Sequence, residues 1–140
     1  MLRRLCVPLL VLLAPAAEAA TVYVDATGVQ VSGGLVFAGL CTGGLEDQSC
    51  TFGQSAPSRT PSLRFVFPQV PPGTYAVAVF QDVNGNGRLD RTPLGLPLEP
   101  YGFSNDAGRL RRPNFPAAAV EVGESDVQVG VRLAPIPQAR

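Results

Sequence analysis

The sequence predicts an all-β protein, an antiparallel Greek-key β-sandwich of about seven strands with one long proline-rich loop. Fifteen glycines and fourteen prolines interrupt the 140 residues, and no apolar repeat of 3.6 residues persists for a dozen positions, which argues against long helices. Apolar and polar side chains instead alternate in several short segments, as they do in strands with one buried face.

Six segments carry this alternation clearly. Strands are expected at residues 21–26, 35–40, 63–67, 74–81, 118–122 and 127–133. Val29 and Val31 continue the strand character of the first segment, whereas residues 50–61, interrupted by two prolines, are expected to form a loop. Residues 82–116 then form a connection of 35 residues, and so long a connection is usually functional or structured by other means.

The strand expected at residues 74–81 is apolar on both faces, so both faces must be covered. Its bulky face is expected to join the core. Its small face carries Ala76 and Ala78. The proline-rich arm is expected to cover this face through three side chains: Leu96, Tyr101 and Phe103.

The first twenty residues are predicted to be a secretory signal peptide. Arg3 and Arg4 precede an apolar run, and Ala17-Glu18-Ala19 supplies the small residues of a cleavage site. A membrane anchor is the alternative, but the run is shorter than the roughly 20 residues that a spanning helix needs. We therefore expect an exported protein, periplasmic or secreted, with no membrane span in its mature form.

The mature protein is expected to consist of one β-sandwich domain, residues 21–134, and a short C-terminal tail, residues 135–140. Cys41 and Cys50 are then its two cysteines, and an exported chain is expected to join them in a disulfide. A redox pair is the alternative, but the spacing is not that of a Cys-x-x-Cys motif.

Charge and composition exclude several classes of function. Eleven basic residues balance eleven acidic ones, whereas a nucleic-acid-binding domain needs a basic face. The chain has no histidine for a Ser-His-Asp triad or a histidine-ligated zinc site, and no lysine for a Schiff base. A protein without catalytic activity is therefore expected.

Oxygen-bearing side chains occupy alternate positions directly after the 74–81 strand. Asp82, Asn84 and Asn86 match positions 1, 3 and 5 of an EF-hand calcium loop, with the carbonyl of Arg88 at position 7 and Asp90 at position 9. This spacing predicts a Ca²⁺ site of modest affinity. A turn without metal is the alternative, because Asn-Gly pairs form turns by themselves.

The pattern departs from an EF-hand in two ways. Position 12 is Pro93 instead of a bidentate glutamate, and the loop follows a strand instead of a helix. Glu99 is the candidate for the missing carboxylate. Alternatively, Asp82, Asp90 and Glu99 form the acid and base of a carboxylate-dependent hydrolase.

Three further features have structural and functional interpretations. Tyr75 follows a Pro-Gly turn and is expected to hydrogen-bond back to the chain, as in a tyrosine corner. Tyr101 and Phe103 either pin the arm to the sandwich or form a ligand surface. Three arginines form a cationic cluster: Arg109, Arg111 and Arg112. The cluster either binds an anion, such as a phosphate, a sulfate or an anionic lipid headgroup, or is simply exposed to solvent.

The stretch PGTYAVAVFQDVNGNGRLD, followed by LGLPLEPYGFSND and Pro113-Asn114-Phe115, resembles a family of small exported bacterial proteins known only as a domain of unknown function. The resemblance implies an immunoglobulin-like or transthyretin-like sandwich and brings no established activity. Gln81 departs from the family pattern, which has histidine there. The leading hypothesis is an exported β-sandwich with a calcium-stabilised loop and an unknown envelope partner; a purely structural domain without ligand is the alternative.

Overall fold

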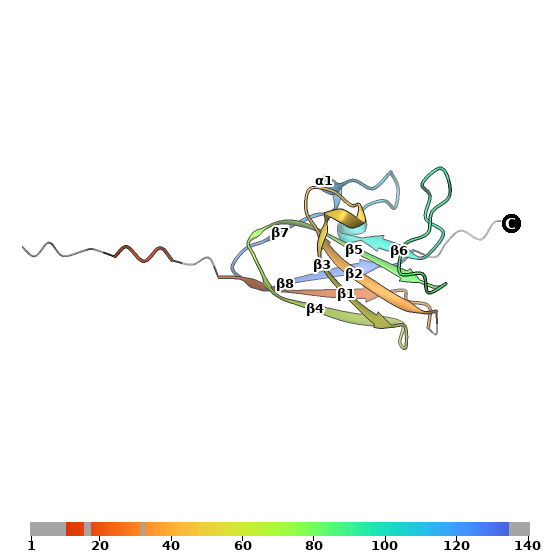
Figure 1. Cartoon of the computed structure of the whole chain (residues 1–140), viewed down its shortest axis with the longest axis horizontal. Helices are drawn as coiled ribbons and strands as arrows, with labels where there is room; N and C mark the ends of the chain where they lie inside the picture. Colours follow the sequence, from red (N-terminus) through yellow and green to blue (C-terminus); the bar gives the residue numbers. More distant parts are fainter. Residues whose placement is uncertain (1–10, 16–17, 32, 135–140) are drawn as a thin grey trace, which may run out of the picture.

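The computed structural model describes residues 11–15, 18–31 and 33–134, and in this part of the chain eight strands form two facing sheets (Figure 1). The predicted all-β sandwich is confirmed. Most of the predicted signal peptide and the predicted tail lie outside the described residues. The strands are β1 Ala20–Thr27, β2 Leu35–Cys41, β3 Cys50–Pro57, β4 Ser62–Val70, β5 Gly73–Asp82, β6 Tyr101–Phe103, β7 Ala119–Val122 and β8 Val127–Arg132.

The first sheet has the order β4-β1-β8, and the second has the order β3-β2-β5-β6, with β7 also paired to β5. The expectation of a wholly antiparallel sandwich is wrong at one pair, because β1 and β8 run parallel, starting from Val22 opposite Val127. The reason is the route of the chain. β7 belongs to the second sheet, and the turn that follows carries the chain across to the end of the first sheet where β1 begins.

Strand β3 was not predicted, because residues 50–61 were expected to form a loop. β3 lies at the edge of the second sheet, antiparallel to β2, and most of its side chains are exposed. Only Phe52 and Ala56 of this edge strand pack against the core, too few to give a clear apolar alternation, so the strand lacks the usual sequence pattern. The first of the two prolines ends it, at Pro57.

Strand character also ends earlier than expected after β1. Gly28 has a φ of 74°, which turns the chain, and Val29 donates its backbone N–H to Pro61 at 3.1 Å instead of joining a strand. Val29 is buried at the rim of the core, whereas Val31 is exposed. Neither residue continues β1.

The main core fills the space between the two sheets and contains the bulky face of β5, as predicted. Tyr75 lies in this core and donates its hydroxyl to the Pro71 carbonyl at 2.8 Å, which confirms the tyrosine-corner hydrogen bond. The core is made by alternate residues of six strands: Val22, Val24, Val36, Ala38, Leu40, Phe65, Phe67, Val77, Val79, Val122, Val129 and Val131.

A second, smaller apolar cluster covers the other face of β5. Ala76 and Ala78 pack there against Phe103 and Tyr101, as expected, and Leu45 joins them from the loop after β2. Leu96 was expected to take part, but its side chain is exposed. The helix α1, Phe115–Ala118, completes the cover, with Asn114 as its N-cap. Among the described residues, no helix has the length and apolarity that a membrane crossing requires.

Candidate functional site

Asp82 ends β5 and holds the backbone of the loop that follows. Its side chain is 1% exposed. Oδ1 accepts N–H bonds from Gly85 at 2.8 Å and Asn86 at 3.2 Å, and Oδ2 accepts one from Gly87 at 2.7 Å. Gly85 and Gly87 have positive φ values, which other residues adopt only with strain, and this conformation turns the amides toward the carboxylate.

Asn84, Asn86 and Asp90 come together on the exposed side of the same loop. Nδ2 of Asn86 donates to both carboxylate oxygens of Asp90 at 2.8 Å, and Nδ2 of Asn84 donates to Oδ2. The amide hydrogen bonds, first that of Asn84 and then that of Asn86, lower the pKa of Asp90, and nearby Arg88 lowers it further. The Arg88 Nε lies 3.6 Å from Oδ1 of Asp90.

Glu99 joins the beginning of the loop to its end. It is 2% exposed, and it accepts the backbone N–H of Val83 on Oε1 and that of Asp90 on Oε2, each at 3.0 Å. Glu99 was predicted as a possible twelfth-position ligand, and the structure does bring it to the loop. Its two oxygens are already used there as hydrogen-bond acceptors.

The four predicted calcium ligands that are side chains therefore fall into two sets. Asp82 faces backbone amides, whereas the side chains of Asn84, Asn86 and Asp90 meet one another, with the Arg88 guanidinium beside them. In the described part of the chain, no three acidic, histidine or cysteine side chains lie close enough to share a metal ion. A cation at Asp90 would need both asparagine amides turned so that oxygen replaces nitrogen.

The three carboxylates of the alternative hydrolase prediction lie near this loop as well. Both oxygens of Asp82 and both of Glu99 accept backbone N–H bonds, and those of Asp90 accept asparagine amides. These hydrogen bonds fix the loop to the end of the sheet. They also make the segment that follows the loop more rigid.

The loop is followed by a short hairpin, residues 90–98, which we call the finger. The backbone N–H of Leu98 bonds to the Asp90 carbonyl, and that of Thr92 bonds to the Leu96 carbonyl, each at 2.8 Å. Gly95, with a φ of 81°, closes the tip. The sequence analysis treated this segment as part of an arm lying on the sheet, whereas the finger projects from it (Figure 1).

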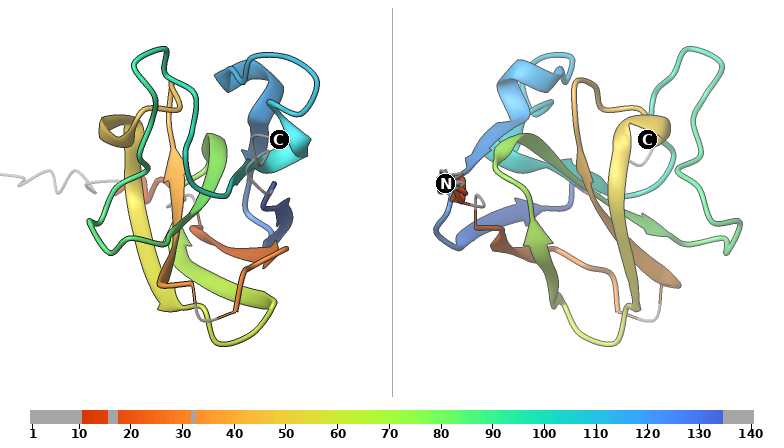
Figure 2. Two further views of the ribbon diagram at one scale, coloured as in Figure 1. Left: turned by 90° about the vertical axis from the view of Figure 1, so that its right-hand side faces the viewer. Right: turned by 60° about the vertical axis from the view of Figure 1, so that its left-hand side comes forward.

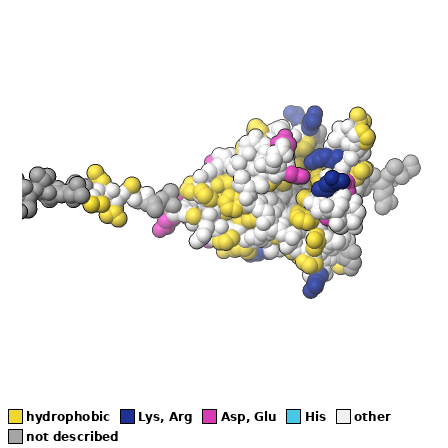
Figure 3. Space-filling model, viewed as in Figure 1, with side chains coloured by type: hydrophobic (Ala, Val, Ile, Leu, Met, Phe, Trp, Pro, Cys, Tyr) yellow, Lys and Arg dark blue, Asp and Glu magenta, His cyan; other side chains and the backbone are white. Residues whose placement is uncertain are grey.

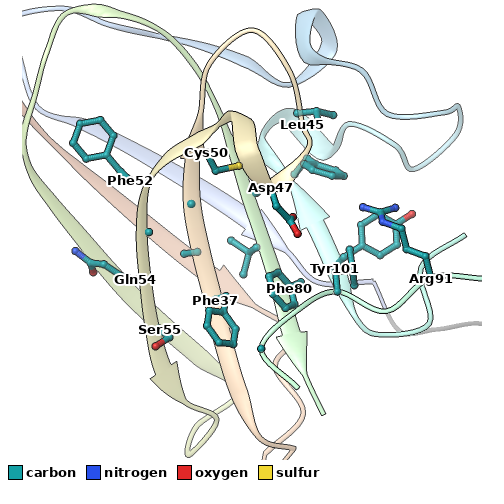
Figure 4. Close-up of a pocket in the computed structure, with 18 residues that line it drawn as sticks. Phe37, Leu45, Asp47, Cys50, Phe52, Gln54, Ser55, Phe80, Arg91 and Tyr101 are labelled. Atoms are coloured by element: carbon teal, nitrogen blue, oxygen red, sulfur yellow. The ribbon is translucent and has the colours of Figure 1, made fainter. Parts of the chain in front are cut away.

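An apolar cleft of about 380 Å³ lies on the outer face of the second sheet, between the strands and the base of the finger (Figure 4). The bottom of the cleft lies close to the strand backbones, because the residues there are small: Gly39, Gly53 and Ala78. At one end, the rings of Phe37 and Phe80 stack with their centroids 5.0 Å apart. The rest of the rim comes from four segments: Leu45, Asp47, Ser55, Leu89, Arg91, Tyr101 and Phe103.

This cleft was not predicted from the sequence. Its signal was available in β2 and β5, where Phe37 and Phe80 alternate with the core residues and so lie on the opposite face. Tyr101 and Phe103, expected either to pin the arm or to form a ligand surface, both pack on the small face of β5 and both line the cleft. Phe103 is buried, whereas Tyr101 is half-buried.

The disulfide between Cys41 and Cys50 is confirmed, and it joins β2 to β3 beside the cleft. It closes the loop that carries Leu45 and Asp47. Figure 4 shows Asp47 pointing from this loop toward the cleft, above Phe80. The cross-link therefore supports one wall of the cleft as well as the edge strand.

Reduction of this disulfide, or its replacement in a Cys41→Ser/Cys50→Ser variant, is expected to lower the free energy of unfolding by about 2.5 kcal/mol, because the cross-link restricts the unfolded chain. Urea unfolding of the oxidised and reduced protein measures the change. Reductant should leave the double variant unaffected, and equal stability of the oxidised and reduced protein would contradict the prediction.

The predicted arginine cluster is divided by one ion pair. Arg109 lies 3.6 Å from Asp106, which also lies 3.6 Å from Arg132. Arg111 and Arg112 are exposed, and among the described residues they form no ion pair. Their loop faces the finger across a wide, open hollow.

A protein-family model described as an uncharacterized protein conserved in bacteria, DUF2141, matches residues 24–130. No curated protein and no solved structure matches the chain.

Proposed function

The chain belongs to the DUF2141 family, which is conserved in bacteria, and from its geometry we propose that it is an exported binding module of the cell envelope without catalytic activity. Its ligand would occupy the apolar cleft on the second sheet. The observation that carries the proposal is the cleft itself: a volume of about 380 Å³ with stacked aromatic rings at one end falls within the range of small-molecule sites, roughly 300–1,000 Å³.

The lining of the cleft indicates the chemical class of ligand. Phe37, Phe80 and Tyr101 offer apolar and aromatic surface, and Asp47 and Arg91 are the charged residues of the lining. A flat aromatic or short acyl group fits such a lining, with one polar group placed at the rim. The predicted signal peptide and the disulfide support an exported location.

The rigid surroundings also support a binding role. The disulfide holds one wall, and the carboxylates of Asp82 and Glu99 hold the base of the finger at the other. A pre-formed cleft binds more tightly because less conformational entropy is lost on binding. The disulfide and the two carboxylates are equally expected in the alternative, a purely structural domain whose cleft has no ligand.

Titration with the fluorescent apolar amine N-phenyl-1-naphthylamine tests the proposal. The parent protein is expected to bind the probe in its cleft, and Gly53→Leu is expected to lower the affinity at least about tenfold, because burying a leucine side chain in the cleft excludes the probe. A Cβ at Gly53 meets no atom within 4 Å, so the variant is expected to fold.

Gly130→Leu is the matched control. Gly130 lies in β8 of the other sheet, and a Cβ there also meets no atom within 4 Å. The N-terminal segment is common to all three proteins, so the comparison reports on the cleft. Equal affinity of the two leucine variants would reject the cleft as the binding site.

Calcium binding is a separate part of the proposal, supported by the convergence of Asn84, Asn86 and Asp90. With a dissociation constant of about 1 mM, as in weak extracellular sites, about 10 mM Ca²⁺ is expected to stabilise the fold by about 1.4 kcal/mol and to raise the melting temperature by about 5 °C. Thermal melting with Ca²⁺ and with a chelator measures the shift.

Asp90→Asn is the variant that should abolish this shift, because it removes the charge from the one carboxylate that faces side chains. Mg²⁺ at the same concentration controls for ionic strength, since it demands a smaller, octahedral site. An identical melting temperature in Ca²⁺ and chelator removes the ion from the proposal and leaves the loop as a hydrogen-bonded turn.

A further inference from the structure

Four leucines are exposed on two neighbouring loops. Three lie on the finger, where Leu94 at the tip is 88% exposed, Leu96 61% and Leu98 48%. The fourth is Leu110, which is 97% exposed in the segment 108–113, here called the arginine loop. Scattered apolar side chains are normal on a protein surface, but a group of large ones at projecting loops marks an interaction site.

The same two loops carry a net positive charge. The finger (residues 90–98) and the arginine loop (residues 108–113) together contain four arginines and one acidic residue, Asp90, although the whole chain has equal numbers of basic and acidic residues. Of the four, only Arg109 forms an ion pair among the described residues, with Asp106. Arg91 instead donates to the carbonyl of Gly95 within the finger, at 3.2 Å.

Both loops project in the same direction. They line one open hollow of about 970 Å³, with Glu46 and Asp47 in the loop after β2 on its rim. Figures 1 and 2 show both loops extending from the second sheet on the side away from the first. In the space-filling view, arginine side chains gather at this end of the molecule, close to apolar atoms at the top of the finger (Figure 3).

Most backbone N–H groups of the finger are hydrogen-bonded. Those of Thr92, Gly95 and Leu98 bond to carbonyls within the finger, and the N–H of Leu96 bonds to the hydroxyl of Thr92 at 3.1 Å. Two of its other residues are prolines, which have no N–H. These bonds lower the cost of moving the finger into an apolar interface, and among the described residues they leave the N–H groups of Arg91 and Leu94 without a partner.

We propose that the finger and the arginine loop dock together on the surface of an anionic lipid bilayer. Leu94 and Leu110 enter the boundary between headgroups and acyl chains, while Arg91, Arg111 and Arg112 bind lipid phosphates. The carboxylates of Asp82 and Glu99, which hold the finger at its base, keep its leucines directed toward the membrane.

Co-sedimentation of the full chain with lipid vesicles tests the proposal. Vesicles of phosphatidylcholine with about one third phosphatidylglycerol are expected to bind the protein more tightly than pure phosphatidylcholine, and added salt is expected to weaken this binding. An Arg111→Ser/Arg112→Ser variant should bind the mixed vesicles less tightly by roughly fivefold for each arginine. Leu94→Ser/Leu110→Ser should lose at least about tenfold.

Two variants with exposed positions outside the two loops are the controls. Val66→Ser removes an exposed apolar side chain from β4, and Arg59→Ser removes an exposed arginine from the turn after β3. Both should bind as the parent does. All proteins carry the same N-terminal segment, so differences between them report on the loops.

Three results would overturn the proposal: absence of vesicle binding by the parent, equal binding to neutral and anionic vesicles, or loop variants that bind as tightly as the controls. Soluble glycerol phosphate serves as a competitor. If it displaces the protein at millimolar concentration, the arginines bind a free phosphate and a bilayer is not needed. If it does not, the bilayer itself is the partner.

Discussion

Replacing Asp82 with alanine is expected to lower the free energy of unfolding by about 3 kcal/mol, roughly 1 kcal/mol for each backbone N–H that its carboxylate accepts. The amides of Gly85, Asn86 and Gly87 all donate to this one side chain, which is almost completely buried, and the amide of Asn86 also donates to Oδ1 of Asn84. Urea unfolding followed by circular dichroism measures the loss. Hydrogen exchange should be faster at these three amides than in the parent protein.

Asp82→Asn separates the charge of the side chain from its shape. Its Oδ1 can still accept two amides, but its Nδ2 would face the N–H of Gly87, so an intermediate loss of about 2 kcal/mol is expected. Glu124→Ala, at an exposed turn, controls for the removal of a carboxylate. If Asp82→Ala is as stable as Glu124→Ala, the carboxylate does not hold the loop.

The sequence predicted most of the fold because the core residues of its strands alternate strictly. β5 shows this best, since its two apolar faces required covers on both sides and both covers were found. The corner hydrogen bond of Tyr75 and the disulfide from Cys41 followed from local rules of the same kind. Each of these features depends on neighbouring residues or on burial, and both leave a pattern in sequence.

The features that the sequence did not predict depend on edges and on distant pairing. β3 is an edge strand that packs only Phe52 and Ala56 against the core, and its pairing with β2 leaves no clear periodic signal. The parallel pair of β1 and β8 joins residues about one hundred positions apart, and nothing local in either strand records the direction of its partner. The two strands of the finger are joined by backbone hydrogen bonds, and such bonds leave no side-chain pattern in the sequence.

The candidate site shows why spacing alone does not decide between an ion and a turn. Oxygens at alternate positions of a curled loop converge, and both a cation and a group of backbone amides satisfy converging oxygens. The sequence therefore indicated that the oxygens of residues 82–90 and of Glu99 lie at one loop, without deciding what these oxygens bind. The structure shows backbone amides around Asp82 and Glu99, and asparagine amides around Asp90.

At Gln81 the resemblance noted in the sequence implies histidine instead, and the structure gives the glutamine side chain a structural role. It is fully buried at the end of β5. Its Oε1 accepts the N–H of Gln30 at 2.9 Å, while its Nε2 donates to the carbonyls of Gln30 at 2.7 Å and Gly33 at 3.0 Å. A neutral histidine has one acceptor and one donor nitrogen, so at this position it would leave at least one of the three bonds unmade.

Gln81→Ala is expected to lower the free energy of unfolding by about 3 kcal/mol, because it removes three hydrogen bonds and leaves the Gln30 N–H and the Gly33 carbonyl without these partners; the Gln30 carbonyl keeps its bond from the Gly33 N–H. Gln81→His should cost less, about 1–2 kcal/mol, since two of the bonds can be kept. Urea unfolding measures both losses against Gln48→Ala, an exposed glutamine in the loop after β2.

Gln81→Glu keeps the size of the side chain and tests whether its hydrogen bonds, instead of its volume, stabilise the fold. An ionised carboxylate cannot donate to the carbonyls of Gln30 and Gly33, so burial raises its pKa in the folded protein and it folds preferably when protonated. Below the ordinary glutamate pKa of about 4.3 this variant should therefore approach the stability of the parent, and the difference should widen as pH rises. A stability difference that stays constant from about pH 4 to about pH 7, across the ordinary glutamate pKa, would mean that the Gln81 amide does not hold this segment by donating hydrogen bonds.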